Sequence, residues 1–335
     1  MSSNPLWHGK PYYSLDAYCK NTFGQKLYKS ALDAGFTCPN RDGTLDTRGC
    51  IFCSTGGSGE FAASLSPSFS LKARIDEALT ITALQKRTDK VIAYFQAYTN
   101  TYAPVEKLEF LYRAALEHPK TAGISIATRP DCLPKEVLAL LNRLQTEYSA
   151  PRNGRNAKFI WIELGLQTIH ERTALFLRRG YSLPCFEDGV QKLKKAGIPV
   201  ITHIILGLPG ESKADMLSAI DYLNMQPVWG IKLQLLHILK GTDLGLLWQK
   251  DPASFGSFST PEQYLDVLIA SLERLRPDMV VHRVTGDAPR SLLLSPLWSG
   301  SKRLVLNTLH KQMKEQNTWQ GKYYNESFTK NFYQT

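Results

Sequence analysis

Residues 38–60 read Cys-Pro-Asn-Arg-Asp-Gly-Thr-Leu-Asp-Thr-Arg-Gly-Cys-Ile-Phe-Cys-Ser-Thr-Gly-Gly-Ser-Gly-Glu, and this stretch holds three of the six cysteines of the chain. Two residues separate Cys50 from Cys53, and eleven separate Cys38 from Cys50. The intervening sequence is rich in Gly, Asp, Asn and Pro, which is typical of a loop. The stretch therefore predicts three thiol groups on one flexible loop.

Three thiolates suit a metal centre that keeps one position open. Cysteines hold iron–sulfur clusters, and a four-iron cluster with three protein ligands leaves its fourth iron for another ligand. Structural zinc takes four ligands instead, and a fourth is available from Cys19, Cys132, Cys185 or one of the seven His. The loop alone leaves an open iron–sulfur cluster, a zinc site and unliganded thiols as alternatives.

Strands and helices alternate on both sides of this loop. Apolar patterns predict strands at 27–37, 91–96, 123–127, 159–166, 200–206 and 231–238, and one more at 280–284. Helical patterns lie at about 70–88, from 104 onward, and at 134–147, 184–196, 211–224 and 261–276. Such alternation favours parallel strands joined by right-handed crossovers, in six βα units that form an open sheet or a barrel.

Polar residues follow one predicted strand after another. They are Gln96, Tyr98, Asn100, Thr128, Arg129, Asp131, Glu163, Gln167 and the segment 207–211. In α/β barrels the chemistry lies at the carboxyl ends of the strands. The pattern therefore favours a barrel in which the strand ends share one site.

Both ends of the chain are basic, as is the chain as a whole. Lys and Arg number 40 against 30 Asp and Glu, for a net charge of +10 and a pI near 9.2. This charge favours a polyanionic partner such as nucleic acid, although solubility alone also explains it. Residues 301–335 combine Lys302, Arg303 and Lys330 with Trp319, which fits either a phosphate-binding face or a solvated helix with its tail.

We divide the chain into an N-terminal extension (1–26), a barrel (27–285) and a basic C-terminal extension (286–335). The first segment mixes aromatic and basic residues, which either stack on nucleotides or pack on the core. The N-terminus has no apolar signal-peptide region, and no apolar run is long enough to span a membrane. We therefore expect a cytoplasmic protein without membrane contact, in which the cysteines are ligands or buried thiols.

The three cysteines, with an aromatic residue just before the last, followed by six βα units with polar strand ends, resemble the radical S-adenosylmethionine (SAM) enzymes. Thr128–Asp131, Glu163–Gln167, Leu206–Gly210, Gly230–Gln234 and Lys240–Asp243 occur in an order similar to that in the catalytic subunit of Elongator. The segments 94–102 and 32–43 are similar to those of the bacterial YtqA/YhcC-type radical SAM proteins.

This resemblance implies a partial (β/α)6, TIM-like barrel and two cofactors. Cys38, Cys50 and Cys53 would hold a 4Fe–4S cluster whose free iron is chelated by the amino and carboxylate groups of SAM. Reductive cleavage of SAM would then give a 5′-deoxyadenosyl radical that abstracts hydrogen from the substrate. The resemblance thus disfavours the zinc alternative.

It also implies roles for the strand-end residues. Gln96, Tyr98 and Asn100 stand where many relatives carry Gly-Gly-Glu near the methionine amino group. Arg129 would pair with the methionine carboxylate, or else with Asp131 as a staple of its own loop.

Glu163 and Gln167 would bond the ribose or adenosine, and the backbone at Leu206, Gly207 and Gly210 would approach the adenine. Glu163 has the alternative of pairing with a basic residue on a neighbouring strand.

Lys232 is the candidate catalytic residue. A lysine in an otherwise apolar parallel strand needs a polar partner, which predicts that it faces the site. His203 and His237 are either core histidines or substrate contacts. Cys19, Cys132 and Cys185 are expected to be buried thiols, with a hydrogen-donor role open for one of the last two.

The likeness to Elongator implies a tRNA-modifying enzyme that acts on the C5 side chain of wobble uridine, with a flavodoxin- or ferredoxin-type protein as its reductant. No acetyltransferase sequence follows the barrel, so we expect trimming of an existing side chain, such as carboxymethylaminomethyl to aminomethyl. The alternatives are a radical SAM enzyme for a small metabolite and a non-catalytic, zinc-bound nucleic-acid-binding protein.

Overall fold

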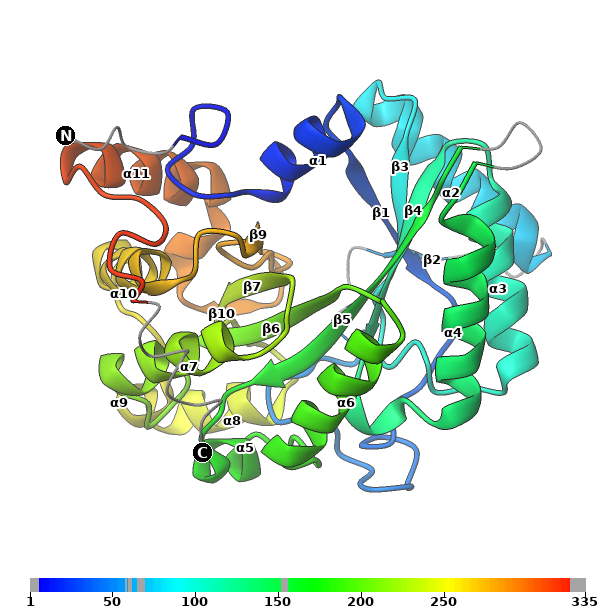
Figure 1. Ribbon diagram of the computed structural model, residues 1–335. Coiled ribbons are helices and arrows are strands. Elements are labelled where there is room, and N and C mark those ends of the chain that lie inside the picture. The colour runs from blue at the N-terminus through cyan, green and yellow to red at the C-terminus, as the bar shows by residue number, and fades with distance from the viewer. Residues whose placement is uncertain (1–5, 58, 60–61, 65–69, 152–155, 326–335) are drawn as a thin grey trace, which may run out of the picture.

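The computed structural model describes residues 6–57, 59, 62–64, 70–151 and 156–325. Eight parallel strands form one curled sheet in the order β2-β1-β3-β4-β5-β6-β7-β9 (Figure 1). They are β1 (Tyr28–Asp33), β2 (Ala63–Ser64), β3 (Val91–Phe95), β4 (Thr121–Thr128), β5 (Phe159–Gln167), β6 (Val200–Leu206), β7 (Gly230–Leu235) and β9 (Val280–Arg283). A small antiparallel pair joins β8 (Ile238–Leu239) to β10 (Leu293–Ser295).

Most of the helices follow a strand in sequence and cover the outer face of the sheet (Figure 1), whereas α1 precedes β1. They are α1 (Leu15–Phe23), α2 (Leu71–Lys86), α3 (Val105–Glu117), α4 (Lys135–Tyr148), α5 (Glu171–Phe176), α6 (Leu183–Lys195), α7 (Lys213–Met225), α8 (Asp243–Lys250), α9 (Pro252–Phe255), α10 (Pro261–Arg274) and α11 (Lys302–Glu315). The predicted partial barrel of alternating strands and helices is confirmed. The sequence did not reveal β2, β8 and β10, because two- and three-residue strands carry no periodic pattern.

Sequence signals at the strand–helix junctions explain where several helices begin. Ser212 and Asp215 form a capping box at the start of α7, and Thr260 and Gln263 form another at the start of α10. Each pair satisfies two backbone N–H groups that the first turn leaves free. The apolar faces of the helices then pack on a sheet whose central strands are buried on both sides, as in β3, where all five residues are buried.

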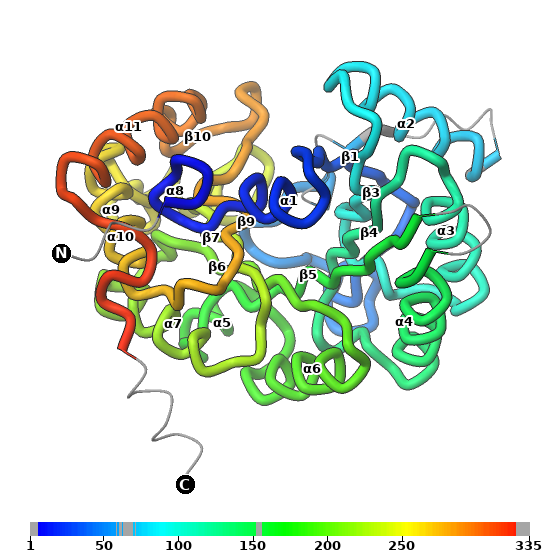
Figure 2. Tube along the Cα trace, turned by 45° about the horizontal axis from the view of Figure 1, so that its top comes forward, coloured from blue at the N-terminus to red at the C-terminus, as the bar shows by residue number. Residues whose placement is uncertain are grey.

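The N-terminal segment packs on the barrel. Figure 2 shows α1 crossing the open side of the sheet between β1 and β9, and Val281 of β9 donates a backbone hydrogen bond to Tyr13. Tyr18 meets the ring of Trp229 edge-on, with centroids 4.8 Å apart. Cys19 is fully buried beside Trp161, as predicted for a structural thiol.

The two terminal segments meet at a polar clasp. Gln320 is fully buried; its amide donates to the carbonyls of Arg276 and Met279 at 2.8 and 2.9 Å and accepts from the backbone of Tyr13 at 2.8 Å. Helix α11 packs inward through Val305 and two further apolar residues. The domain limits at 26/27 and 285/286 stay predictions, and Lys330 lies outside the described residues.

No helix in the described ranges combines the length and the apolar character needed to cross a bilayer.

Candidate active site

A cavity of about 970 Å³ lies inside the curled sheet, toward the carboxyl ends of the strands. Its size matches that of small-molecule and cofactor pockets. Of the residues predicted for the site, its lining includes Cys38, Cys50, Cys53, Gln96, Tyr98, Arg129, Glu163, Gln167 and Lys232. Asn100, Leu206, Gly207 and Gly210 are outside the lining.

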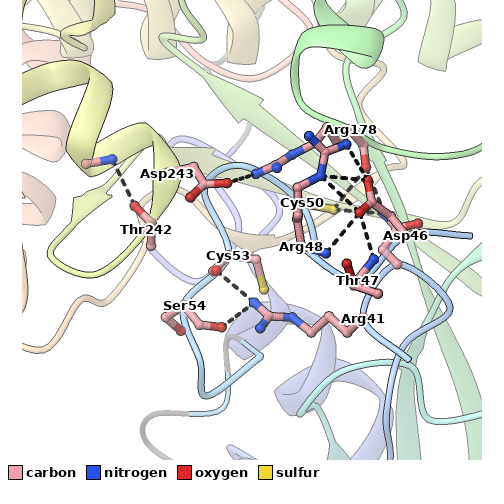
Figure 3. A network of polar contacts seen from close by, with 12 residues as sticks. Arg41, Asp46, Thr47, Arg48, Cys50, Cys53, Ser54, Arg178, Thr242 and Asp243 are labelled. Atoms are coloured by element: carbon pink, nitrogen blue, oxygen red, sulfur yellow. Dashed lines mark hydrogen bonds and ion pairs between the residues drawn. The ribbon is translucent and has the colours of Figure 1, made fainter. Parts of the chain in front are cut away.

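The cysteine loop is held in shape by arginine side chains (Figure 3). Arg41 donates hydrogen bonds from Nη2 to the carbonyls of Cys53 and Ser54, at 2.8 and 2.6 Å. Arg48 pairs with Asp46 within the same loop, with 2.8 Å between Nη2 and Oδ2. This segment has no regular secondary structure, and the guanidinium of Arg41 donates the hydrogen bonds that backbone N–H groups would otherwise supply to these two carbonyls.

Two nitrogen donors point at cysteine sulfurs. Asn40 Nδ2 lies 3.5 Å from Cys50 Sγ, and Arg129 Nη1 lies 3.9 Å from Cys38 Sγ. Hydrogen bonds to ligand sulfurs tune metal centres and orient their ligands. Both donors therefore suit sulfurs that carry negative charge.

Glycines allow close packing around the loop. Gly57 has φ +59°, and a Cβ there would lie 2.5 Å from the ring of Tyr98. Gly180 has φ +79°, and a Cβ there would lie 2.6 Å from Asn40 Oδ1. Only glycine permits these approaches, which press Tyr98 and Asn40 against the cysteine side of the cavity.

The three cysteines fit an open iron–sulfur cluster. Their thiols line one cavity, and burial, aided by the nearby Cys53, raises the pKa of Cys50 to about 12. A thiolate at Cys50 therefore needs a bound cation to offset its charge. Within the described ranges no three His, Cys, Asp or Glu side chains come close enough to hold one metal ion; cluster ligands can stand further apart because they bind different irons.

Below the cysteine loop, seven strands each contribute one polar side chain to a group that we call the floor cluster. Its members are Lys29, Tyr94, Ser125, Glu163, His203, Lys232 and Arg283. The strand register places His203 beside Lys232, and Lys232 beside Arg283. Trp161, two residues before Glu163 on the same strand, belongs to the aromatic cluster packed by α1, which closes the barrel beneath the floor cluster.

Glu163 is the centre of the floor cluster and its side chain is completely buried. Oε1 accepts from Lys29 Nζ and, at 2.6 Å, from Ser125 Oγ. Oε2 accepts from Lys232 Nζ and lies 2.7 Å from His203 Nε2. Four donors on two oxygens satisfy the carboxylate fully, which is the condition for burying a charge.

The protonation states of this cluster follow from its crowding. Burial opposes the charge on Glu163, but Lys232, Lys29 and His203 outweigh it and hold the pKa of Glu163 well below its usual value. Burial lowers the pKa of Lys232 well below its usual value even though Glu163 acts in the opposite direction. Burial is the main cause of the lowered pKa of Lys232, and the nearby ammonium of Lys29, which shares the same carboxylate, adds to it.

His203 is expected to stay neutral from pH 8 to about 5. Burial and the nearby Lys232 lower its pKa from 6.5 to about 4, although its bond to Glu163 acts in the opposite direction. NMR titration of labelled histidine side chains, with His203→Gln to assign the signal, measures this pKa. Between pH 6.5 and 4 the unfolded chain binds the extra proton and the folded chain does not, so the stability contributed by neutral His203 falls as the pH drops through this range. A midpoint near 6.5 would contradict the assignment.

Several predicted residues make contacts within the protein. Arg129 forms a two-pronged ion pair with Asp131, at 2.9 and 2.7 Å, which matches the loop-staple alternative. Glu163 pairs with basic strand residues, which matches its own alternative. Asn100 is fully buried, and its amide donates to the carbonyls of Ala97 and Ala127.

The segment after β6 also faces away from the cavity. Leu206 is buried in the core, and a Cβ at Gly207 would lie 2.5 Å from Ser257 Oγ and 2.8 Å from the Phe258 ring. Gly210 has φ +80° and an open surrounding. Leu206 is the last residue of β6, and Gly207 and Gly210 lie in the turn that follows it.

Sequence reasoning missed Lys29, Tyr94, Ser125 and Arg283 as site residues. Lys29 had a usable signal, since it is a lysine inside a predicted strand, the same feature that pointed to Lys232. Ser125 and Tyr94 sit in apolar strands where a single hydroxyl is common, so no local pattern marks them.

Comparison with known proteins agrees with this geometry. The sequence profile of the Radical SAM superfamily matches residues 47–223, and that of the Radical_SAM C-terminal domain matches residues 228–315. The chain is 41% identical to the uncharacterized protein YtqA of Bacillus subtilis, over 97% of both chains. It is 34% identical to protein YhcC of Escherichia coli, over 88% of this chain and 89% of that one.

More distant matches include Elongator complex protein 3. The Drosophila melanogaster protein is 28% identical over 55% of this chain and 31% of its own. The solved structure of the archaeal Methanocaldococcus infernus Elp3, with an N-terminal deletion, shares the fold with a TM-score of 0.62 at 14% identity; the match covers 88% of this chain and 64% of that one. The chain belongs to the radical SAM superfamily, whose members use a 4Fe–4S cluster and S-adenosylmethionine.

Proposed function

We propose that this radical SAM enzyme modifies tRNA at the C5 side chain of wobble uridine, by trimming carboxymethylaminomethyl to aminomethyl. The observation that carries the proposal is one cavity that joins a three-cysteine loop to a buried, lysine-rich floor. Such a cavity admits a small substituent and brings it below the cofactors, while the bulk of a large substrate stays outside.

The cysteine end of the cavity would hold the cofactors. Cys38, Cys50 and Cys53 are the cluster ligands, and Arg129 and Asn40 orient two of their sulfurs. When bound, the cluster and SAM supply a 5′-deoxyadenosyl radical for removing a hydrogen atom from the substrate. The chain supplies position and exclusion of water around that step.

The SAM-binding wall is assigned to Gln96, Tyr98 and Gln167, which line the cavity. Asn100 supports this wall from behind, because its amide ties the turn after β3 to the end of β4. Leu206, Gly207 and Gly210 shape the neighbouring strand end by backbone alone. Lys232 is a candidate substrate-contacting residue from the floor.

Charge supports a polyanionic substrate. Among the described residues, eight Lys and Arg line the cavity against two carboxylates, Glu163 and Asp287. Lys302 extends this basic rim onto α11, and the whole chain carries a net charge of +10. A basic rim attracts phosphates without regard to sequence. The matches to Elongator complex protein 3 add weight to the wobble-uridine assignment.

We assign the reducing electron to a flavodoxin- or ferredoxin-type protein of the cytoplasm. Such a donor supplies single electrons at the low potential that an iron–sulfur cluster of this kind requires.

The test is an anaerobic assay of the reconstituted protein with SAM, dithionite and bulk tRNA from a strain that lacks the gene. We expect 5′-deoxyadenosine to form and one modified uridine to exchange its carboxymethyl group for a hydrogen atom, with the two removed carbons released by hydrolysis as glyoxylate and SAM consumed as the oxidant. Deoxyadenosine without any nucleoside change would contradict the tRNA assignment and favour a small metabolite. A colourless, zinc-loaded protein that binds tRNA without cleaving SAM would favour the non-catalytic alternative.

A further inference from the structure

We propose that the floor cluster is a binding site for a carboxylate group carried by the substrate. The inference rests on the proposed function in one respect: it takes the carboxylate to be the end of the uridine side chain that enters the cavity. Its basis is an excess of cationic donors, the buried Lys232 and the half-buried Lys29 and Arg283, over the single buried carboxylate among them.

The charge balance of the floor cluster is positive. Lys29 and Lys232 pair with one carboxylate, Glu163, and Arg283 stands beside Lys232 in the strand register. Burial lowers the pKa of both lysines, and a second carboxylate beside them would favour their charged forms. At the rim, the carboxylate of Asp287 lies 2.7 Å from Lys302 Nζ and 3.8 Å from the guanidinium of Arg283. Lys302 is therefore its main partner and balances most of its charge. Buried cations in excess of their partners favour the uptake of an anion.

The cationic groups also retain hydrogen-bond donors. An ammonium has three N–H donors; among the described residues, Lys29 donates to Glu163 alone, and Lys232 to Glu163 and Tyr94. Arg283 lines the cavity, and its guanidinium is too far from Asp287 for a hydrogen bond. All three side chains therefore offer a donor to an incoming anion.

The aromatic surface beside these donors limits the size of the ligand. The ammonium groups of Lys29 and Lys232 lie 4.5 and 4.6 Å from the centre of the Tyr94 ring, which fixes them on one side of the space. Trp161 and its neighbours close the barrel below. A backbone phosphate is flanked by chain on both sides and cannot enter such a closed end, whereas a terminal carboxylate can.

This site is separate from the place where the carboxylate of SAM is expected. Glu163 lies four residues before Gln167 on β5, and Ser125 on β4 lies four residues before Arg129, which follows the end of that strand. At about 3.3 Å per residue, four extended residues span at most roughly 13 Å, which is an upper limit here because the register of β5 shifts between Gly165 and Gln167. The cysteines and Arg129 belong to the upper level, so the floor cluster is left for the substrate.

The first experiment measures the binding of labelled acetate, with acetamide as the neutral probe, to the reconstituted holoenzyme in the presence of SAM by NMR. We expect acetate to bind and acetamide not to bind, with acetate affinity falling roughly 10- to 100-fold in Lys29→Gln and Arg283→Gln. Arg283→Gln covers the case in which Lys29→Gln fails to fold, since in the part of the chain that the structure describes Arg283 forms an ion pair with Asp287 and not with Glu163. Lys86→Gln, which changes another lysine of the same cavity, is the matched control and keeps the affinity.

Equal acetate affinity in the wild type and in Lys29→Gln and Arg283→Gln would overturn the proposal. Displacement of acetate by SAM would also overturn it, because the site would then belong to the cofactor.

A second experiment compares tRNA bearing the carboxymethylaminomethyl group with tRNA in which that carboxylate is an amide. The amide is expected to lower kcat/KM roughly 10- to 100-fold in the wild type and far less in Arg283→Gln. Turnover of neither tRNA would refute the proposed function, while the acetate measurement would still decide the floor site.

Discussion

Replacing Cys53 by alanine is expected to abolish the iron–sulfur absorbance of the reconstituted protein and to lower 5′-deoxyadenosine formation by more than about 100-fold. Loss of a group that merely orients a metal ligand costs up to about 100-fold, and loss of the ligand itself should cost more. Cys53 lines the cavity, and Arg41 holds its backbone carbonyl at 2.8 Å. The loop around the missing thiol is thus expected to keep its shape, so the effect reports on ligation.

The measurement is iron content and visible absorbance after anaerobic reconstitution, followed by chromatographic quantification of 5′-deoxyadenosine. Cys185→Ala is the matched control, since Cys185 is a half-buried thiol on α6 that does not line the cavity. The control should keep both cluster and activity. A Cys53→Ala protein with full iron content and full activity would remove Cys53 from the ligand set.

Replacing Glu163 by glutamine is expected to lower the free energy of unfolding by about 3–5 kcal/mol, the cost of removing one partner of a buried ion pair. Glutamine keeps the size and part of the hydrogen bonding but leaves Lys29 and Lys232 without their counter-charge. Denaturant unfolding at pH 7 measures the change. Glu171→Gln is the control: this carboxylate is 58% exposed, 3.5 Å from Arg179, and its loss should cost less than about 1 kcal/mol.

The pH dependence of this difference tests its electrostatic origin. Because the folded-state pKa of Glu163 lies well below its ordinary value of 4.5, its contribution is complete above that value and is lost as the pH falls through the folded-state pKa. The gap between wild type and Glu163→Gln should therefore be constant from pH 7 to about 5 and shrink at lower pH. Adding Lys232→Met to Glu163→Gln should restore part of the stability, because it removes one unbalanced charge. If Glu163→Gln alone is as stable as the wild type, the burial of the two lysines does not depend on the charge of Glu163.

The turn after β3 contacts the cysteine loop through Tyr98. Tyr98 has φ +60°, and its hydroxyl donates to the carbonyl of Thr55 in the cysteine loop. Its ring occupies the space that the glycine at 57 leaves free. The end of β3 thus braces the cysteine loop directly, which ties the geometry of the proposed cluster site to that of the proposed SAM wall.

The sequence by itself determined the architecture and the position of the cysteine loop. Strand and helix periodicities are local properties of the chain, so the order of β1, β3, β4, β5, β6 and β7 with their helices was readable. The spacing of Cys38, Cys50 and Cys53 within a turn-rich segment was equally local. Even the inward direction of Lys232 followed from one rule, that a charge in an apolar strand needs a partner.

Only the tertiary structure decided which side chains the charged residues of the strands pair with. Glu163 meets Lys29, Lys232 and His203 across 134, 69 and 40 residues of sequence, and no local pattern encodes such pairings. They depend on the curl of the sheet, which brings β1 and β7 to opposite sides of one carboxylate, and on a register that a slip of one residue would reverse. The same holds for Arg129 and Asn100, whose donors are used by the nearby Asp131 carboxylate and by the carbonyls of Ala97 and Ala127. A buried polar group forms hydrogen bonds with the groups that the folded chain brings within reach, and the packing of the elements determines which groups these are.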